Sequence, residues 1–264
     1  MQVGERAGLQ ARASCGNGAR HDPRRHAMPP APRRMRLSER HVEALRREIV
    51  DPGFQAVPGM RPTTEADYDE IVSSLIAQAP EEGFWVFAYG SLIWNPDFAF
   101  VEERLATARG WRRTFCLGWD YRWRGNRDAP GLMLALDRGG SCRGVAFRLP
   151  PDALEENLHR LVRREMSMIP SAFPPRWIGI ETGDGHLKSL TFAMNRNSGR
   201  YVAGLPDEKL AEVLATAQGF RGSMTEYLFS TVQTLEERGI HDRYLWRLQA
   251  LVAERIEAAQ GWTA

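Results

Sequence analysis

The sequence feature that most restricts the fold is a continuous apolar run, Phe84-Trp85-Val86-Phe87-Ala88-Tyr89, which stops at Gly90-Ser91. A short run of this kind, ended by a turn signal, predicts a buried strand that enters a tight turn. Further segments bounded by Gly, Asp, Asn and Pro also predict strands, and they span residues 111–117, 131–136, 144–149, 176–181 and 187–194. Their spacing favours a small antiparallel or mixed β-barrel.

Helical patterns interrupt and follow these strands, at about residues 151–165, 207–217, 223–238 and 241–258. Two more precede them. The first is expected to begin after Ser38, a suitable N-cap, and to end at Asp51-Pro52-Gly53. The second is expected to begin at Pro62-Thr63-Thr64-Glu65 and to end at Pro80. The expected fold class is therefore α+β, a small mixed or antiparallel barrel with surrounding helices and an N-terminal helical extension.

Three parts of the chain are expected: a disordered basic tail (1–35), a helical extension (36–80) and a main domain (81–260). The tail is rich in Arg and Pro and has no apolar stripe. It resembles an organelle-targeting peptide, and translation from Met28 or Met35 is the alternative explanation. The first 34 residues hold seven arginines and two acidic residues, which leaves 28 of the 35 basic and 31 of the 33 acidic residues for the rest. That near-neutral body argues against binding to nucleic acid.

Cysteine and histidine usage restricts the chemistry further. Cys15, Cys116 and Cys142 are odd in number and form no CxxC pair, which predicts a reducing compartment, the cytoplasm, and no cysteine-based zinc site. The six histidines contain no HxxxH or HxH pair, so no metal site is expected. No apolar run reaches the roughly 18 residues that a membrane span requires.

The strand that ends at Gly90-Ser91 leaves successive backbone N–H groups without ladder partners, and such groups can bind an anion. The glycine permits a close backbone approach, and the serine adds a short hydroxyl that can bond a carboxylate. A plain turn from strand to loop explains the same residues.

Glu165 continues the apolar stripe Leu154, Leu158, Leu161 of the helix predicted at 151–165. Desolvation and the negative end of the helix dipole both disfavour its charged form, so a raised pKa suited to a general base is expected. Arg163 and Arg164 would oppose this shift. The alternative is an edge residue that reaches solvent or pairs with an arginine.

Two other segments have competing explanations. The Gly-rich turn at 219–222 leads to Ser223, a suitable N-cap, with Glu226 at the capping-box position, and the helix N-terminus there is either an anion site or a simple cap. Arginines and aromatics alternate between Trp111 and Arg124, as in proteins that bind single-stranded nucleic acid. Amphipathic strands beside a polar loop explain that alternation better.

Taken together, the turn at 89–94, Arg164-Glu165 after a short helix, and Gly-Ser-x-x-Glu-Tyr-Leu at 222–228 resemble the ChaC family of glutathione-specific gamma-glutamylcyclotransferases. The segments 142–149 and 241–246 match that family as well. The resemblance covers about residues 84–255 and implies the fold of the family.

The resemblance implies cleavage of glutathione to 5-oxoproline and L-cysteinylglycine by attack of the substrate's own α-amine, without metal or organic cofactor. Glu165 would be the general base. The substrate-binding residues would be those of the strand and its turn, together with one tyrosine: Val86, Phe87, Ala88, Tyr89, Gly90, Ser91, Leu92 and Tyr227.

The chain departs from the family pattern at Phe173, where relatives carry a tyrosine, at Met224 and at Ala88. Two alternatives therefore stay open: a cyclotransferase for another gamma-glutamyl amine or dipeptide, and a non-enzymatic binding or regulatory protein of the same fold. A pure binding protein has no need for a carboxylate on the apolar face of a helix, which weighs against the second.

Overall fold

The computed structural model describes residues 34–262, so most of the predicted basic tail, with Cys15, lies outside the described residues. From Met35 onward the chain forms one compact unit. The separation of a helical extension (36–80) from a main domain (81–260) stays a prediction.

Five strands close into a barrel in the order β2-β4-β3-β6-β7. They are β2 (Trp85–Ala88), β3 (Glu102–Asp120), β4 (Gly131–Arg148), β6 (Pro175–Thr182) and β7 (Gly185–Phe192). Neighbours pair antiparallel except β2 and β7, which pair in parallel at Val86 and Leu190. The predicted mixed barrel is confirmed.

The long strands differ from their prediction. The strands predicted at 131–136 and 144–149 form the single strand β4, which ends at Arg148, and β3 begins at Glu102 rather than at 111. Gly139 and Gly140 have φ angles of 103 and 78, values that side-chain-bearing residues rarely adopt. They let β4 bend locally, opposite the register shift between Arg109 and Trp111 of β3, while the strand continues. The glycines therefore mark a bend in β4 and not its end.

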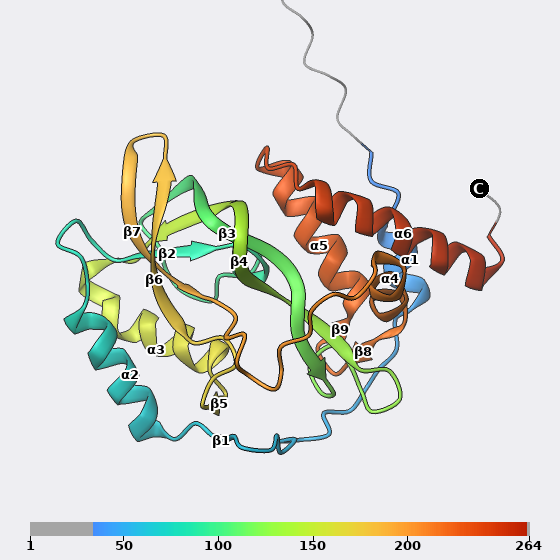
Figure 1. Ribbon diagram of the computed structural model, residues 1–264, viewed down its shortest axis with the longest axis horizontal. Coiled ribbons are helices and arrows are strands. Elements are labelled where there is room, and N and C mark those ends of the chain that lie inside the picture. Colours follow the sequence, from blue (N-terminus) through green and yellow to red (C-terminus); the bar gives the residue numbers. More distant parts are fainter. Residues whose placement is uncertain (1–33, 263–264) are drawn as a thin grey trace, which may run out of the picture. The chain divides into compact units, whose positions relative to one another are not determined.

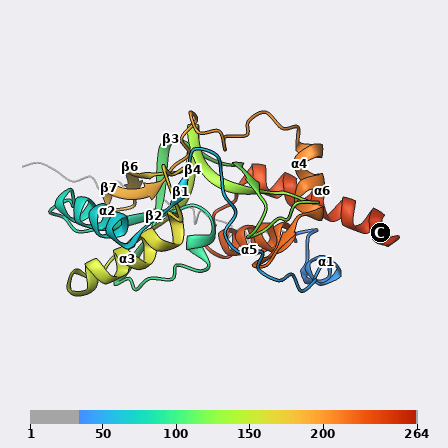
Figure 2. The same cartoon turned by 90° about the horizontal axis from the view of Figure 1, so that it is seen from below.

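The helices cover the barrel in two groups (Figure 1), with α2 beside α3 and α4 to α6 together. Seen from below, α3 lies against the barrel strands (Figure 2). The helices are α1 (Glu39–Ala44), α2 (Glu65–Ala77), α3 (Leu154–Glu165), α4 (Asp207–Thr216), α5 (Met224–Glu237) and α6 (Arg243–Gln260). Short two-stranded pairs join β1 (Arg61–Pro62) to β5 (Met168–Ile169) and β8 (Gln218–Gly219) to β9 (Gly222–Ser223).

The first helix is shorter than expected, because α1 ends at Ala44 and not at Asp51. Most helical stability comes from packing an apolar face, and Val50 is 85% exposed. The residues that follow α1 therefore have little apolar surface to bury and run on without regular structure to β1.

The core explains why the run from Phe84 to Tyr89 is apolar throughout. Trp85 and Phe87 belong to the cluster inside the barrel, whereas Val86 and Ala88 face the larger cluster between the barrel and the helices. Because successive residues of a strand point to opposite faces, a strand with a core on each side needs apolar residues at every position. The buried strand predicted at this place is confirmed.

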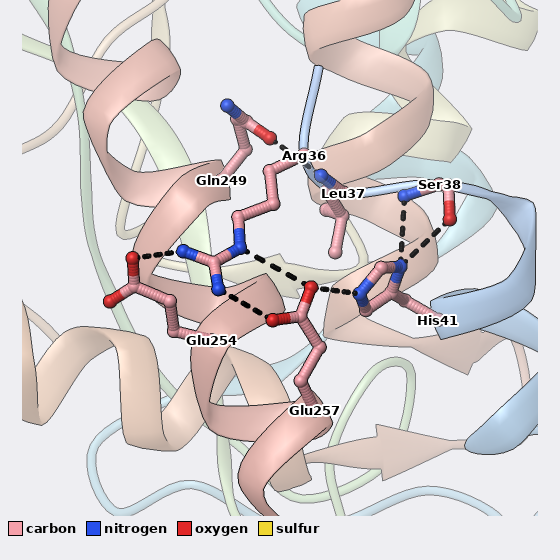
Figure 3. A network of polar contacts seen from close by, with 7 residues as sticks. All are labelled: Arg36, Leu37, Ser38, His41, Gln249, Glu254 and Glu257. Carbon is pink, nitrogen blue, oxygen red and sulfur yellow. Dashed lines mark hydrogen bonds and ion pairs between the residues drawn. The ribbon is translucent and has the colours of Figure 1, made fainter. Parts of the chain in front are cut away.

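The N-terminal segment is fastened to α6 by a polar network (Figure 3). The Arg36 guanidinium donates to Glu257 at 3.2 and 2.6 Å and also pairs with Glu254. The Leu37 N–H donates to Gln249 Oε1 at 2.8 Å, and His41 Nε2 lies 3.2 Å from Glu257 Oε1. These contacts hold the start of the described chain against α6.

Substitution Gln249→Leu is expected to lower the free energy of unfolding by about 1–3 kcal/mol, because it leaves the buried N–H of Leu37 without an acceptor. Urea denaturation measures the change. The matched control is Glu254→Gln, which weakens an exposed ion pair of the same network and is expected to cost less than about 0.5 kcal/mol. Equal effects of the two substitutions would contradict the prediction.

Candidate active site

The chain leaves β2 through a tight turn. Gly90 is the N-cap of the short helix η1 (Ser91–Ile93), and its carbonyl accepts a hydrogen bond from the Ile93 N–H at 2.9 Å. The Ser91 carbonyl accepts one from Asn95 at 2.8 Å. Within the described residues the N–H of Gly90 has no hydrogen-bond partner. The turn therefore offers a backbone donor to a ligand, as the sequence predicts.

Tyr227, from the first turn of α5, packs directly against this turn. A Cβ added to Gly90 would lie 3.1 Å from the Tyr227 hydroxyl oxygen. Burial raises the pKa of Tyr227 to about 12, the charge of Glu165 adds to the shift, and hydrogen bonds from Ser91 oppose it in part. The hydroxyl is thus protonated at neutral pH and can donate a hydrogen bond to a substrate oxygen.

Glu165 is the last residue of α3, and its side chain is only 16% exposed. Burial raises the pKa of this carboxyl, and Arg164, whose Nε lies 3.3 Å from Glu165 Oε1, partly opposes the shift. The pKa of Glu165 shifts in the expected direction, and the carboxyl also pairs with an arginine, as the alternative interpretation expected. A carboxyl in this state can accept and release a proton near neutral pH more readily than an exposed one.

Arg164 ties the end of α3 to the turn after β2. Its Nη2 donates to the Ser91 hydroxyl at 3.1 Å, and its Nη1 donates to the Asn95 carbonyl. Glu165 also acts electrostatically on the turn, because its charge contributes, after burial, to raising the pKa of Tyr89 and of Tyr227. Side chains from α3, α5 and the end of β2 therefore share one site.

The chain directly after Glu165 is held by the segment that precedes α2. The Thr63 hydroxyl donates to the Met166 carbonyl at 2.7 Å, and the Thr63 N–H donates to the Ser167 carbonyl at 3.2 Å. The β1–β5 pairing continues this contact at Ile169 and Met168. The end of α3, and with it Glu165, is thus supported from outside the helix.

The residues predicted from the sequence fall into two groups. Glu165, Gly90, Ser91 and Tyr227 come together around the turn, whereas the Tyr89 hydroxyl donates to the Phe192 carbonyl at 2.8 Å in the cluster of Trp85 and Phe87. The remaining predicted residues are buried behind it, at 0–7% exposure, and are Val86, Phe87, Ala88 and Leu92. The second group shapes the turn through packing, and its contact with substrate stays a prediction.

Two arginines in the site belong to the run from Trp111 to Arg124, to which sequence reasoning gave no role in this site. Arg113 of β3 donates through Nη1 to the Tyr89 carbonyl at 2.9 Å. Arg124 lies over the Tyr227 ring, 5.7 Å from its centroid, and pairs with Glu226 at 2.5 Å. Glu226 is therefore not a capping-box residue, although Ser223 caps α5 as expected. Arg113 stands two residues from Trp111 and two from Phe115, so the three side chains share one face of the strand. A charged residue between two aromatic residues on one strand face is the sequence signal that could have identified Arg113.

Other features of the described chain carry no chemistry of this kind. A surface cleft of about 620 Å³ lies at the N-terminal end of α3, and Glu165 does not line it. Cys116 and Cys142 are buried, and burial raises the pKa of Cys116 to about 12, as expected of an inert thiol.

Among residues 34–262 no cluster of three or more His, Cys, Asp or Glu could hold a metal ion. In the same range no helix is long and apolar enough to cross a membrane.

Comparison with known proteins decides the family. The model of the ChaC-like protein family matches residues 84–255. The chain belongs to the ChaC-like family. Among its members, the glutathione-specific gamma-glutamylcyclotransferase of Escherichia coli (strain K12) is 38% identical over 65% of this chain and 74% of its own. Glutathione-specific gamma-glutamylcyclotransferase 1 of Mus musculus is 32% identical over 56% of this chain and 67% of its own.

The fold is that of the ChaC-like family as well. A crystal structure of a gamma-glutamyl cyclotransferase specific to glutathione from yeast superimposes with a TM-score of 0.59 at 20% identity, over 65% of this chain and 96% of the yeast chain. The resemblance to the ChaC family and its fold, expected from the motifs, is confirmed.

Proposed function

We propose that this protein is a glutathione-specific gamma-glutamylcyclotransferase, the activity for which its ChaC-like relatives are named. The observation that carries the proposal is the Glu165 carboxyl, buried on the apolar face of α3 and tied through Arg164 to the Gly90-Ser91 turn. A buried carboxyl beside free backbone donors suits a reaction that moves a proton and develops negative charge on an oxygen.

The proposed reaction needs no water, because the substrate carries its own nucleophile. Glu165 takes a proton from the α-ammonium group of the glutamyl residue, and the freed nitrogen attacks the γ-carbonyl carbon to close a five-membered ring. The bond from that carbon to the cysteine nitrogen then breaks, and Glu165 returns the proton to the leaving nitrogen. The ring nitrogen gives up its second proton, which also passes to the leaving amine, so the lactam is neutral and L-cysteinylglycine leaves as an ammonium. The products are 5-oxoproline and L-cysteinylglycine.

The turn and Tyr227 have supporting roles in this proposal. The Gly90 N–H faces no partner of its own and would stabilise the oxygen of the attacked carbonyl as it gains charge. The protonated Tyr227 hydroxyl, which lies against Gly90, would donate to the same group or to a substrate carboxylate. Holding the glutamyl chain in its folded conformer supplies much of the remaining rate, since oriented groups reach effective molarities of about 10⁵ M or more.

Three further expectations accompany the proposal. The proton transfers are complete without a metal or an organic cofactor. The cytoplasmic location follows from the odd number of cysteines without a CxxC pair. Residues 36–80 would be an extension of the main domain (81–260), and the match to the family beginning at residue 84 supports this division.

The test is release of 5-oxoproline from millimolar glutathione by the purified protein, with a panel of other gamma-glutamyl amines and dipeptides run beside it. Release from glutathione above all other substrates supports the proposal. Release only from another gamma-glutamyl compound would support the cyclisation reaction and reject glutathione as the substrate. Binding without turnover of any substrate would favour a regulatory protein.

The pH dependence of kcat/KM reports the state of Glu165. Because the base acts as a carboxylate and burial raises its pKa, the rate is expected to fall as pH drops through a pKa above the ordinary glutamate range. Substitution Arg164→Met removes the opposing positive charge, so it is expected to move this acid limb to higher pH. The control is Arg163→Met, whose partner is Glu65 on the surface. An acid limb that stays in place in Arg164→Met would contradict the prediction.

A further inference from the structure

Arg113 is a buried charge in contact with the turn and with α6. Its side chain is 1% exposed and extends from β3. Its Nη1 donates to the Tyr89 carbonyl at 2.9 Å, and its Nε lies 3.0 Å from Asp242 Oδ2. Asp242 belongs to the segment 241–246, which resembles the ChaC family, and the proposed reaction gives this segment no role.

Asp242 has two contacts at once. It is the N-cap of α6, where its Oδ1 accepts a hydrogen bond from the Leu245 N–H at 3.0 Å, and its other oxygen faces Arg113. The start of α6 is therefore held in register with β3 and, through Arg113, with the residue before Gly90.

Stability alone does not account for this arrangement. Arg113 Nε and Nη2 are both buried without a hydrogen-bond partner among residues 34–262, so Nε meets Asp242 as an ion pair only. A buried charge that leaves donors unpaired costs stability, and apolar residues of similar volume in such positions are often as stable or more stable. A role in the site explains why a guanidinium occupies the place.

The peptide bond between Tyr89 and Gly90 shows what that role is. It is not among the cis peptide bonds of the chain, so its C=O and N–H point in opposite directions. Arg113 binds the C=O, so the Gly90 N–H points in the opposite direction, away from Arg113. A carbonyl bonded to a cation also strengthens the N–H of its own peptide as a donor.

We propose that Arg113 and Asp242 form a positioning pair that aims the Gly90 N–H at the carbonyl oxygen of the substrate. This inference rests on the proposed function, and Arg113 acts through the peptide without touching the substrate. Asp242, the N-cap of α6, thereby helps to orient the turn after β2.

The test compares Arg113→Met and Asp242→Asn with the wild type in the 5-oxoproline assay. Losing one donor to a developing oxyanion costs about 10²–10³ in kcat, and a misdirected donor costs part of that, so Arg113→Met is expected to lower kcat by about 10- to 30-fold. KM is expected to change less than about threefold, because the donor acts on the transition state. The double variant is expected to be no slower than Arg113→Met, since Asp242 acts through Arg113.

The matched control is Arg247→Met, which removes another ion pair of α6, the one that exposed Arg247 makes with Asp207 of α4. It is expected to leave kcat unchanged. A second readout does not depend on activity: the amide ¹⁵N and ¹H shifts of Gly90 are expected to move in Arg113→Met and in Asp242→Asn but not in Arg247→Met.

The inference is overturned if Arg113→Met keeps kcat within about threefold of the wild type, or if the Gly90 amide signal does not move. If Arg113→Met does not fold, Asp242→Asn carries the test, because asparagine keeps the N-cap acceptor and removes only the charge. A wild-type protein that releases no 5-oxoproline refutes the proposed function, and an unmoved Gly90 signal then refutes the positioning pair separately.

Discussion

Substitution Glu165→Gln is expected to lower kcat for 5-oxoproline release by about 10³-fold or more, at the upper part of what positioned general bases contribute. Glutamine keeps the shape of the side chain, but it cannot take a proton from the α-ammonium group of the substrate. The carboxyl belongs to the last residue of α3, and the neighbouring Arg164 bonds Ser91 of the turn, so the substitution acts at the site itself. Steady-state kinetics with glutathione measure the loss.

The same substitution is not expected to unfold the protein. A carboxyl whose pKa is raised in the folded state contributes stability at low pH and loses it as pH rises through the folded pKa. In its ionised form Glu165 therefore destabilises the fold relative to a neutral residue. Glu165→Gln is expected to melt at or above the temperature of the wild type.

The control is Glu156→Gln on the same helix. Glu156 is exposed and pairs with Arg160 one turn away, so its loss is expected to leave kcat unchanged. Retained activity in Glu165→Gln together with lost activity in Glu156→Gln would assign the base to Glu156 and reject Glu165.

Substitution Gly144→Ala is expected to damage both the barrel and the site. A Cβ at this position of β4 would lie 2.3 Å from the Ala88 carbonyl oxygen and 2.8 Å from the Phe87 ring, distances that force the backbone of β2 to move. Overpacking of this kind costs about 1–3 kcal/mol of unfolding free energy, and often more where backbone must shift. Because a displacement of about 1 Å can cost about 10²-fold in rate, kcat/KM is expected to fall about a hundredfold.

Gly179→Ala is the matched control, because Gly179 also lies in a barrel strand and a Cβ there would meet no atom within 4 Å. Its effect on the unfolding free energy is expected to stay within about 0.5 kcal/mol. Denaturant titrations measure the unfolding free energy of both variants, and steady-state kinetics measure their kcat/KM. If Gly144→Ala behaves like Gly179→Ala, the close approach of β4 to β2 does not control the site.

Local patterns were enough to predict most elements of the fold. The apolar run at 84–89 is a buried strand with a core on both faces, and α4, α5 and α6 lie within a few residues of their expected positions. Such patterns work because burial and helix periodicity act over short stretches of chain. They failed at β3 and β4, where glycine was interpreted as a strand end, since only strand pairing shows whether a glycine ends a strand or bends it.

The order of residues was sufficient to predict the barrel class and the family and to propose Glu165 as the base, because an acidic residue on an apolar helix face is visible in that order alone. The surroundings of that carboxyl depend on the folded chain. Arg164 reaches Ser91, Tyr227 meets Gly90, and Arg113 joins Asp242 to the Tyr89 carbonyl across residues far apart in the chain. Such contacts depend on how the strands close and how the helices pack, and no local pattern of residues encodes the distance between two side chains that the fold brings together.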